Sequence, residues 1–255
     1  MERVYDDVQL AGVYQAGNEM PEVSLRAWVD LIGSFSPRPA PAVVEIGAGT
    51  GMFCAAMARW RRASLVVGVD PSEAMLAQAR QFNGREAGVH YVGGTADAVP
   101  TGGDLFDLAL LSRVIHHLPN RLACARELVR VLRPGGVAVI RTTFREGLDS
   151  VVYDYWPRLR EIDAERFPGR DEVLADFTGS GFSVLELASF AQPVTGSLSE
   201  YHARMRTRPQ SKFTHLTSAE FSDGLTRMKA DADAEQGPHS RPVLERYDVA
   251  VLIRS

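Results

Sequence analysis

The sequence has only two cysteines and no long apolar run. Cys54 and Cys124 lie far apart in apolar segments, so they cannot form the disulfide framework of a small secreted protein, and we expect a reduced, cytoplasmic protein. No stretch approaches the roughly 18 apolar residues that a membrane-spanning helix needs, so we expect no membrane partner. The acidic first residues, MERVYDDVQLAG, lack the apolar region of a signal peptide.

An excess of positive charge is also lacking, since 28 lysines and arginines stand against 32 aspartates and glutamates and the formal net charge is −4. Proteins that bind nucleic acid carry a basic field, so we expect no nucleic-acid partner. The one dense basic patch, RWRR at residues 59–62, has the character of a solvated helix end. Apolar residues are plentiful: 45% of the 255 residues are hydrophobic, which suffices for one large domain with a full core.

Short apolar segments alternate with segments of helical periodicity between residues 41 and 145. This alternation is typical of right-handed βαβ units, which build a parallel sheet covered by helices on both faces. We expect strands at residues 42–47, 64–70, 89–94, 105–112 and 137–144. We expect helices at residues 51–60, 71–82 and 121–132, the last of them closed by the turn RPGG.

The two flanks of this region have different patterns. Apolar residues at near-helical spacing predict a helix over residues 21–35, so we interpret residues 1–40 as an N-terminal helical lid segment and residues 41–145 as the core. After residue 145 the alternation stops, and residues 146–255 are expected to supply substrate-cap helices and closing antiparallel strands within the same single domain. Helices are expected at residues 148–170 and 171–182 and twice within 197–235, and strands at residues 182–194 and 241–255.

The stretch VVEIGAGTGMF places Gly47, Gly49 and Gly51 between a predicted strand and a predicted helix. Glycines there permit a tight turn and a close approach of the backbone to a ligand. The spacing is not that of the dinucleotide motif, because Met52 stands where that motif has its third glycine. Glu45, near the end of the strand, disfavours a phosphate and suits a cationic amine. The alternative interpretation is an ordinary glycine-rich turn.

Asp70 ends the next predicted strand, about twenty residues after the glycine loop (residues 47–51). A carboxylate at this point can accept hydrogen bonds from both hydroxyls of a ribose. The alternative interpretation is that Asp70 only caps the helix that begins at Pro71. The loop, the carboxylate and the order of the strands together favour a nucleoside site.

Five segments carry a resemblance to a known family, and in chain order they are EIGAGTG, GVDPSEAML, GTADAVP, LLSRVIHHLP and LRPGG. The set resembles the class I S-adenosylmethionine-dependent methyltransferases, in the small-molecule branch called methyltransferase type 11, most strongly over residues 41–144. The resemblance implies an α/β, Rossmann-like fold with helices on both faces and a helical cap. It implies a seven-stranded sheet of order 3-2-1-4-5-7-6 with the last strand antiparallel. It also implies S-adenosylmethionine as cofactor and a small molecule as methyl acceptor.

The same resemblance assigns contacts to the cofactor. The three glycines of the loop would line its methionine and ribose part. Glu45 would lie near the amino group, and Asp70 would hold the ribose hydroxyls. Pro71 and Met75 would flank the adenine, which suits the polarisable thioether of methionine. Ser112, at the end of the fourth strand, would face the methionine part of the cofactor through its backbone.

The turn after the third predicted strand departs from the family pattern. Relatives often have Asp where this chain has Thr95, and a hydroxyl accepts less strongly from the adenine amino group than a carboxylate does. Ala96 still offers its backbone N–H to the ring. Asp97 either replaces the missing carboxylate or is a solvated turn residue.

The segment before the first strand closes over the cofactor in similar proteins, and it contains Tyr5, Tyr14 and Arg26. Arg26 would pair with the methionine carboxylate, or it is a solvated arginine on an amphipathic helix. Tyr5, Tyr14 and Glu19 are also polar groups at the mouth of the site. We therefore keep Tyr14 and Glu19 as catalytic candidates.

The adjacent residues His116 and His117 follow the fourth predicted strand, where the resemblance places the transferable methyl group. One imidazole could act as a general base, because its ordinary pKa near 6.5 suits proton transfer at neutral pH, or both could pack or orient. We expect no metal site, because no cysteine or carboxylate lies nearby at ligand spacing. Similar sugar O-methyltransferases place an acid after the fifth strand, whereas this chain has Thr142 and Thr143, which weakens O-methylation.

Two aromatic-rich segments, residues 148–170 and 194–216, are expected to shape the acceptor pocket. They favour a planar or apolar acceptor, unless they are simply helix core. We predict a methyltransferase of small-molecule secondary metabolism, such as natural-product biosynthesis, and favour C-methylation of an electron-rich aromatic such as an indole. O- or N-methylation of a small molecule is the alternative, and a cofactor-binding protein without catalysis is the third interpretation.

Overall fold

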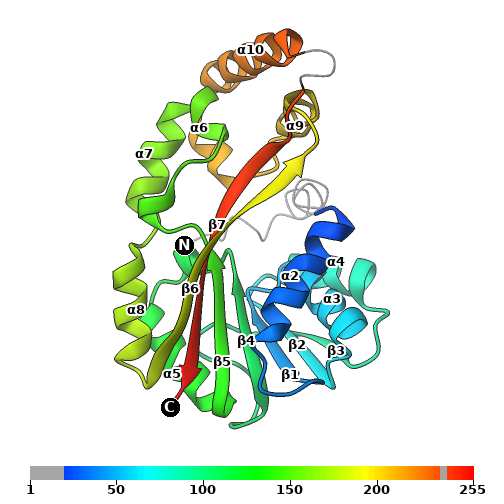
Figure 1. Cartoon of the computed structure of the whole chain (residues 1–255), viewed down its shortest axis with the longest axis vertical. Coiled ribbons are helices and arrows are strands. Elements are labelled where there is room, and N and C mark those ends of the chain that lie inside the picture. Colours follow the sequence, from blue (N-terminus) through cyan, green and yellow to red (C-terminus); the bar gives the residue numbers. More distant parts are fainter. Residues whose placement is uncertain (1–19, 236–239) are drawn as a thin grey trace.

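The computed structural model describes residues 20–235 and 240–255 of the chain. Their centre is a seven-stranded sheet in the order β3-β2-β1-β4-β5-β7-β6 (Figure 1). β1 to β5 run parallel, and β7 runs antiparallel to both of its neighbours. The strands are β1 (Ala42–Ile46), β2 (Leu65–Asp70), β3 (Val89–Gly93), β4 (Phe106–Ser112), β5 (Leu132–Thr142), β6 (Phe182–Thr195) and β7 (Val243–Arg254). The predicted fold class and strand order are confirmed.

Helices cover both faces of the sheet, because alternate residues of each strand point to opposite faces. In β4, Leu108 and Leu110 pack with one helix layer, while Ala109 and Leu111 pack with the other. The first layer contains α2 (Glu22–Ser34), α3 (Met52–Arg61) and α4 (Glu73–Asn83), and the second contains α5 (Arg121–Val131) and α8 (Arg170–Thr178). Burial on both faces explains why the central strands are continuous apolar runs in the sequence.

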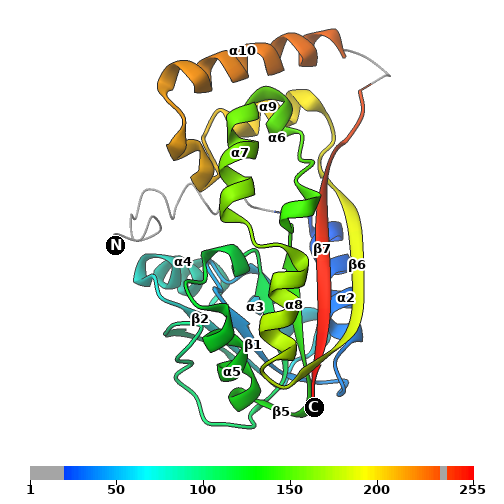
Figure 2. The same cartoon turned by 90° about the vertical axis from the view of Figure 1, so that its left-hand side faces the viewer.

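A helical cap lies above the carboxyl ends of the parallel strands, and β6 and β7 continue upward into it (Figures 1 and 2). Its helices are α6 (Val152–Tyr155), α7 (Pro157–Arg166), α9 (Leu198–Met205) and α10 (Ser218–Ala234). Trp156 centres a separate apolar core there, stacked on Phe221 with ring centroids 5.6 Å apart. The indole N–H of Trp156 donates to the Phe221 carbonyl at 3.2 Å, so this buried polar group is satisfied.

Two local predictions are wrong. The turn RPGG was expected to separate a helix from the fifth strand, but β5 begins at Leu132, directly after α5, and pairs with β4 through an irregularity. The helix predicted over residues 148–170 is divided into two, because Pro157 lacks a backbone N–H and therefore begins a new helix, α7. Among the described residues, no helix is both long enough and apolar enough to cross a membrane.

Candidate functional site

The glycine loop joins β1 to α3 in a backbone conformation that side chains rarely adopt. Gly47, Gly49 and Gly51 have φ values of +69°, +54° and +79°. A Cβ on Gly47 would lie 2.5 Å from the Val114 side chain, and a Cβ on Gly51 would collide with the Tyr91 hydroxyl. Both positions therefore require glycine, and the loop backbone can approach a ligand closely at the carboxyl end of β1.

Asp70, at the end of β2, holds the glycine loop in place. Its Oδ2 accepts the Gly49 N–H at 2.9 Å, and its Oδ1 accepts the Ser72 N–H at 2.9 Å. Ser72 is the cap of α4, because its hydroxyl accepts the Met75 N–H at 3.3 Å. The alternative interpretation of Asp70 as the helix cap is therefore wrong, while its contact with a ribose stays a prediction.

Glu45 is a buried carboxyl on β1, with 4% of its surface exposed. The Cys54 thiol donates to its Oε2 at 2.9 Å. Burial raises the pKa of Glu45 to about 8, and the neighbouring Asp70 adds to the rise. Burial disfavours the ionised carboxylate of Glu45 more than its hydrogen bonds stabilise it. A cationic group beside Glu45 would therefore favour the ionised form and would itself be stabilised by the negative charge.

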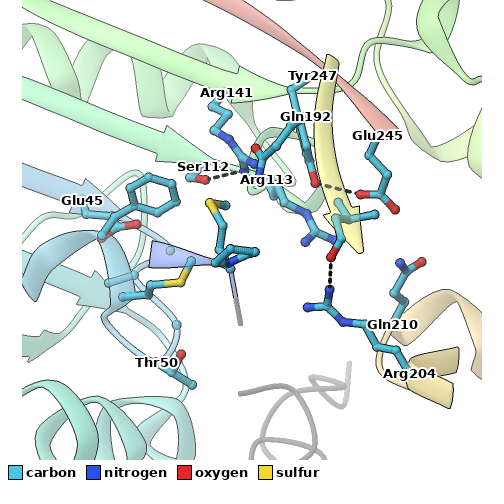
Figure 3. Close-up of a pocket in the computed structure, with 18 of the residues that line it drawn as sticks. Glu45, Thr50, Ser112, Arg113, Arg141, Gln192, Arg204, Gln210, Glu245 and Tyr247 are labelled. Carbon is cyan, nitrogen blue, oxygen red and sulfur yellow. Dashed lines mark hydrogen bonds between the residues drawn. The ribbon is translucent and has the colours of Figure 1, made fainter. Parts of the chain in front are cut away.

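A pocket opens beside the glycine loop, where the carboxyl ends of β1, β4 and β5 meet β6, β7 and α9 (Figure 3). Glu45 and Thr50 lie on one side of the pocket, and Glu245, Gln210 and Arg204 lie on the other (Figure 3). A ligand held at the loop would therefore present its far end to side chains from β5, β7 and the cap.

Arg141, at the end of β5, lies between these two sides and was missed by the sequence analysis. It is 1% exposed, and its Nη1 donates to the Ser112 hydroxyl at 3.2 Å. Its guanidinium carbon lies 3.8 Å from the Tyr247 ring centroid and 4.5 Å from that of Trp28. Within the described part of the chain, its Nε and Nη2 have no hydrogen-bond partner. The available signal was one charged residue inside the apolar strand VAVIRTTF.

β7 forms the wall opposite the glycine loop, and no sequence motif marked it. Glu245 and Tyr247 share a face of the strand because they are two residues apart. The Tyr247 hydroxyl donates to Glu245 Oε2 at 2.8 Å, and the Tyr201 hydroxyl lies 3.5 Å from Glu245 Oε1. On the same face, Val243 packs in the cap core and Val249 in the sheet core. One strand therefore connects cap, pocket and sheet.

The residues predicted to surround the adenine lie in the segments that follow β2 and β3, outside the pocket lining. Pro71 and Asp97 are exposed, and Met75 is buried in the first turn of α4. Thr95 takes part in an isolated β-bridge, and Ala96 packs against the sheet core. Their adenine contacts stay predictions. The members of the predicted cofactor set that line the pocket are Glu45, Gly47, Gly49 and Ser112.

Arg26 is the one described residue of the predicted N-terminal set. Arg26 is exposed on α2, with its guanidinium carbon 6.0 Å from the centre of the Trp60 ring, and it does not line the pocket. Its ion pair with the cofactor carboxylate stays a prediction. Tyr5, Tyr14 and Glu19 lie outside the described residues.

His116 and His117 lie on a short 3₁₀ helix, η2 (Ile115–His117), after β4. The His116 ring stacks on Phe167, with ring centroids 4.2 Å apart. The centroid of the His117 ring lies 4.1 Å from that of the His116 ring. Neither histidine lines the pocket. Desolvation lowers the pKa of both imidazoles, so both are neutral at pH 7. A catalytic role for either stays a prediction.

Comparison with known proteins gives consistent matches. A family model described as a methyltransferase domain matches residues 44–140. The malonyl-acyl carrier protein O-methyltransferase of Pseudescherichia vulneris is 30% identical over 200 residues, which are 77% of this chain and 74% of that enzyme. The enzyme of the same name from Serratia marcescens is 34% identical over 137 residues, which are 53% of this chain and only 50% of that enzyme. A proposed methyltransferase of an antibiotic pathway from Anabaena variabilis shares the fold with a TM-score of 0.71, at 23% identity over 89% of this chain and 98% of that chain.

Proposed function

Because the chain belongs to the class I S-adenosylmethionine-dependent methyltransferases, in the type 11 family, we propose that it methylates a small molecule in the pocket between the glycine loop and β7. S-adenosylmethionine is the cofactor. The acceptor atom that we favour is a ring carbon of an electron-rich aromatic such as an indole. The observation that carries the proposal is one pocket with a backbone loop on one side and polar and aromatic side chains on the other.

The glycine-loop side fits the cofactor chemically. Glu45 is a buried carboxyl with a raised pKa, so the ammonium group of the cofactor would find a partner there. The loop backbone and Ser112 would hold the methionine part, and Asp70 would hold the ribose. When bound, the cofactor supplies an electrophilic methyl group on a sulfonium sulfur.

The opposite side can position a planar acceptor. Methyl transfer requires the nucleophilic atom within about 3–3.5 Å of the methyl carbon and in line with its bond to sulfur. Tyr201 and Tyr247 line the pocket on this side, and aromatic side chains hold a planar ring by stacking and edge contacts. A ring held in this way would face the glycine loop.

Methylation at a ring carbon forms a C–CH3 bond and releases one proton from the acceptor. Glu245 is a carboxylate in the pocket lining, and we propose it as the group that accepts this proton. His116 and His117 are neutral and able to accept a proton, but they lie outside the lining. We therefore propose that the histidines position η2 and the end of β4.

Methylation of a carboxylate oxygen is the second candidate. The similarity to a malonyl-acyl carrier protein O-methyltransferase over 74% of that enzyme supports it, and so does the buried guanidinium of Arg141 in the pocket. In this reaction the carboxylate is the nucleophile and no proton is released, so Glu245 would have no proton to accept.

The test is to incubate the purified protein with S-adenosylmethionine labelled with ¹³C in its methyl group and with panels of indoles, phenols, amines and carboxylic acids. NMR of the products distinguishes a new C–CH3 group from O–CH3 and N–CH3 groups. Glu245→Gln should slow C-methylation and leave carboxylate methylation unchanged. Cofactor binding without formation of S-adenosylhomocysteine on any panel would refute the proposal and favour a binding protein without catalysis.

A further inference from the structure

We infer that Arg141 binds a carboxylate of the methyl acceptor, so that the acceptor is an aromatic acid held by its charged end. The inference rests on the proposed function and names its substrate class. Arg141 is a specificity-determining residue in this scheme, because it contacts the part of the acceptor that distinguishes an acid from its neutral analogue.

The first argument is the unsatisfied edge of the guanidinium. Nη1 of Arg141 is occupied by the Ser112 hydroxyl, whereas Nε and Nη2 are buried and have no partner among the described residues. Leaving buried donors unpaired costs free energy, and the cost is larger for a charged group. Nε and Nη2 form one edge of the planar guanidinium, and this edge matches the two oxygens of a carboxylate.

The second argument is that the guanidinium is already held in place. The rings of Tyr247 and Trp28 pack against its carbon, and the Trp28 indole N–H itself donates to Gln192, a residue of the pocket wall. The N–H groups lie in the guanidinium plane, so ring packing does not consume them. A preorganised partner loses little conformational entropy when a ligand binds.

The third argument is the charge around the pocket. Among the described residues that line it, three are arginines and two are glutamates, so the lining keeps an excess of positive charge even when both glutamates are ionised. The sulfonium of the cofactor would add one more positive charge. An anionic acceptor therefore complements the lining better than a neutral one does. The arginines are Arg113, Arg141 and Arg204.

The fourth argument concerns the rest of the acceptor. Gln210 also lines the pocket, and its buried side-chain oxygen has no partner among the described residues. An N–H group on the acceptor would satisfy this oxygen. An indole that carries a carboxylate on a side chain has both groups, an N–H donor on the ring and an anion at the other end.

The place of Arg141 in the sheet separates it from the nucleoside part of the cofactor. The glycine loop follows β1 and Asp70 follows β2, whereas Arg141 is on β5, two strands from β1 in the opposite direction. Neighbouring strands are about 4.8 Å apart, so Arg141 lies roughly 10 Å from the loop in the sheet direction. The nucleoside would extend from the loop toward β2, away from Arg141.

The experiment measures binding by calorimetry to protein saturated with S-adenosylhomocysteine, which cannot react. The probes are indole-3-acetate and its neutral analogue indole-3-acetamide. The wild-type protein should bind the acid at least about tenfold more tightly than the amide, as expected for a charge-assisted pair of hydrogen bonds. Arg141→Gln should bring the ratio close to one, and Arg141→Lys, which keeps the charge and loses the planar fork, should give an intermediate ratio. Arg145→Gln removes an exposed guanidinium four residues away, paired with Glu172 at 2.8 Å, and should leave the ratio unchanged.

Three results would overturn the inference. One is equal binding of acid and amide by the wild-type protein, a measurement that needs no variant to fold. Another is an acid-to-amide ratio that Arg141→Gln leaves unchanged. The third is a loss of S-adenosylhomocysteine affinity in Arg141→Gln as large as the loss for the acid, which would assign Arg141 to the cofactor. If the protein prefers the acid through Arg141 but transfers no methyl group, the carboxylate site is supported and only the proposed function is refuted.

Discussion

The two sides of the pocket differ in the groups that they offer to a ligand: one side is mainly backbone, and the other is side chains. On the glycine-loop side, the working groups are the loop backbone, which Asp70 holds in place through the Gly49 N–H, and the one buried carboxyl of Glu45. On the β5–β7 side, they are the long side chains of Arg141, Glu245 and Tyr247. A backbone surface suits a ligand that stays the same, whereas side chains can be exchanged without moving the strands. The first side is therefore suited to a constant cofactor and the second to an acceptor that differs among relatives.

The largest effect on stability and on cofactor binding should come from a substitution in the glycine loop, because its backbone conformation leaves no room for a Cβ. Gly51→Ala places a Cβ at a φ of +79° and against the Tyr91 hydroxyl. The free energy of unfolding should fall by about 2–4 kcal/mol, and cofactor affinity should fall with it. Urea denaturation measures the first quantity. Gly102→Ala, where no atom lies within 4 Å of the added Cβ, is the control and should change stability by about 1 kcal/mol or less.

The next largest effect should come from Asp70, which orders the glycine loop and is predicted to bind the ribose of the cofactor. Asp70→Asn keeps the shape and removes the charge that orders the Gly49 N–H, so S-adenosylhomocysteine affinity should fall about 10- to 100-fold in calorimetry. Asp154→Asn, at an exposed position on α6, is the matched control and should have little effect, whereas Asp97→Asn tests the predicted adenine contact. Unchanged affinity in Asp70→Asn would contradict the ribose assignment, and a large loss in Asp97→Asn would identify Asp97 as the missing adenine carboxylate.

Glu45 should make the affinity of the loop side for its ligand depend on pH. Its pKa is raised to about 8 in the free protein, and the ammonium group of the ligand favours the ionised form. Binding therefore releases a proton, so S-adenosylhomocysteine affinity should rise from pH 6 to pH 8, by at most about tenfold per unit, and then level off. Glu45→Gln should flatten this profile, and a profile that it leaves unchanged would assign the slope to another group.

The same carboxyl should affect the stability of the free protein in the opposite direction. Because folding raises the pKa of Glu45 from 4.5 to about 8, the folded state binds this proton more tightly than the unfolded state does. Its contribution to stability is therefore greatest below pH 4.5 and is lost as the pH rises toward 8. Denaturation of wild type and Glu45→Gln across this range measures the difference, and parallel curves would contradict it.

The smallest effects should come from the histidines, which belong to neither side of the pocket. His116→Ala removes the stacking on Phe167, worth about 0.5–1.5 kcal/mol, so the melting temperature should fall by about 2–5 °C. The value of kcat should change less than tenfold for His116→Ala and for His117→Ala. A loss of kcat beyond about 100-fold at an unchanged melting temperature would instead indicate a general base.

The parts of the site that the sequence predicted are those with local signals. Glycines spaced by two residues and a carboxylate at the end of the next strand are such signals, and both belong to the loop side. The doubled histidine is an equally local signal, but it lies outside the pocket lining. The sheet order followed from the family resemblance and from the late pair of long strands. Asp70 illustrates the limit even here, because its bond to Gly49 depends on two adjacent strands and gave no sequence signal.

The acceptor side could not be predicted because its members meet only through long-range pairing. Arg141 lies opposite Val249 in the β5–β7 ladder, and this register brings Tyr247 against its guanidinium. The sequence pointed to Thr142 and Thr143, because similar proteins have an acid there. Successive side chains of a strand point to opposite faces, however, and it is Arg141, the residue before them, that lines the pocket. Trp28 belongs to the helix predicted over residues 21–35, and that apolar spacing gave no sign that its ring packs on Arg141.

The continuity of β7 limits how this protein can change during evolution. Odd-numbered residues from Val243 to Val251 all use one face of the strand, first in the cap, then in the pocket and finally in the sheet core. Inserting or deleting one residue near Asp248 would turn Glu245 and Tyr247 to the other face or displace the core valines. New acceptor preferences can therefore arise along this strand by exchanging side chains, but not by changing its length.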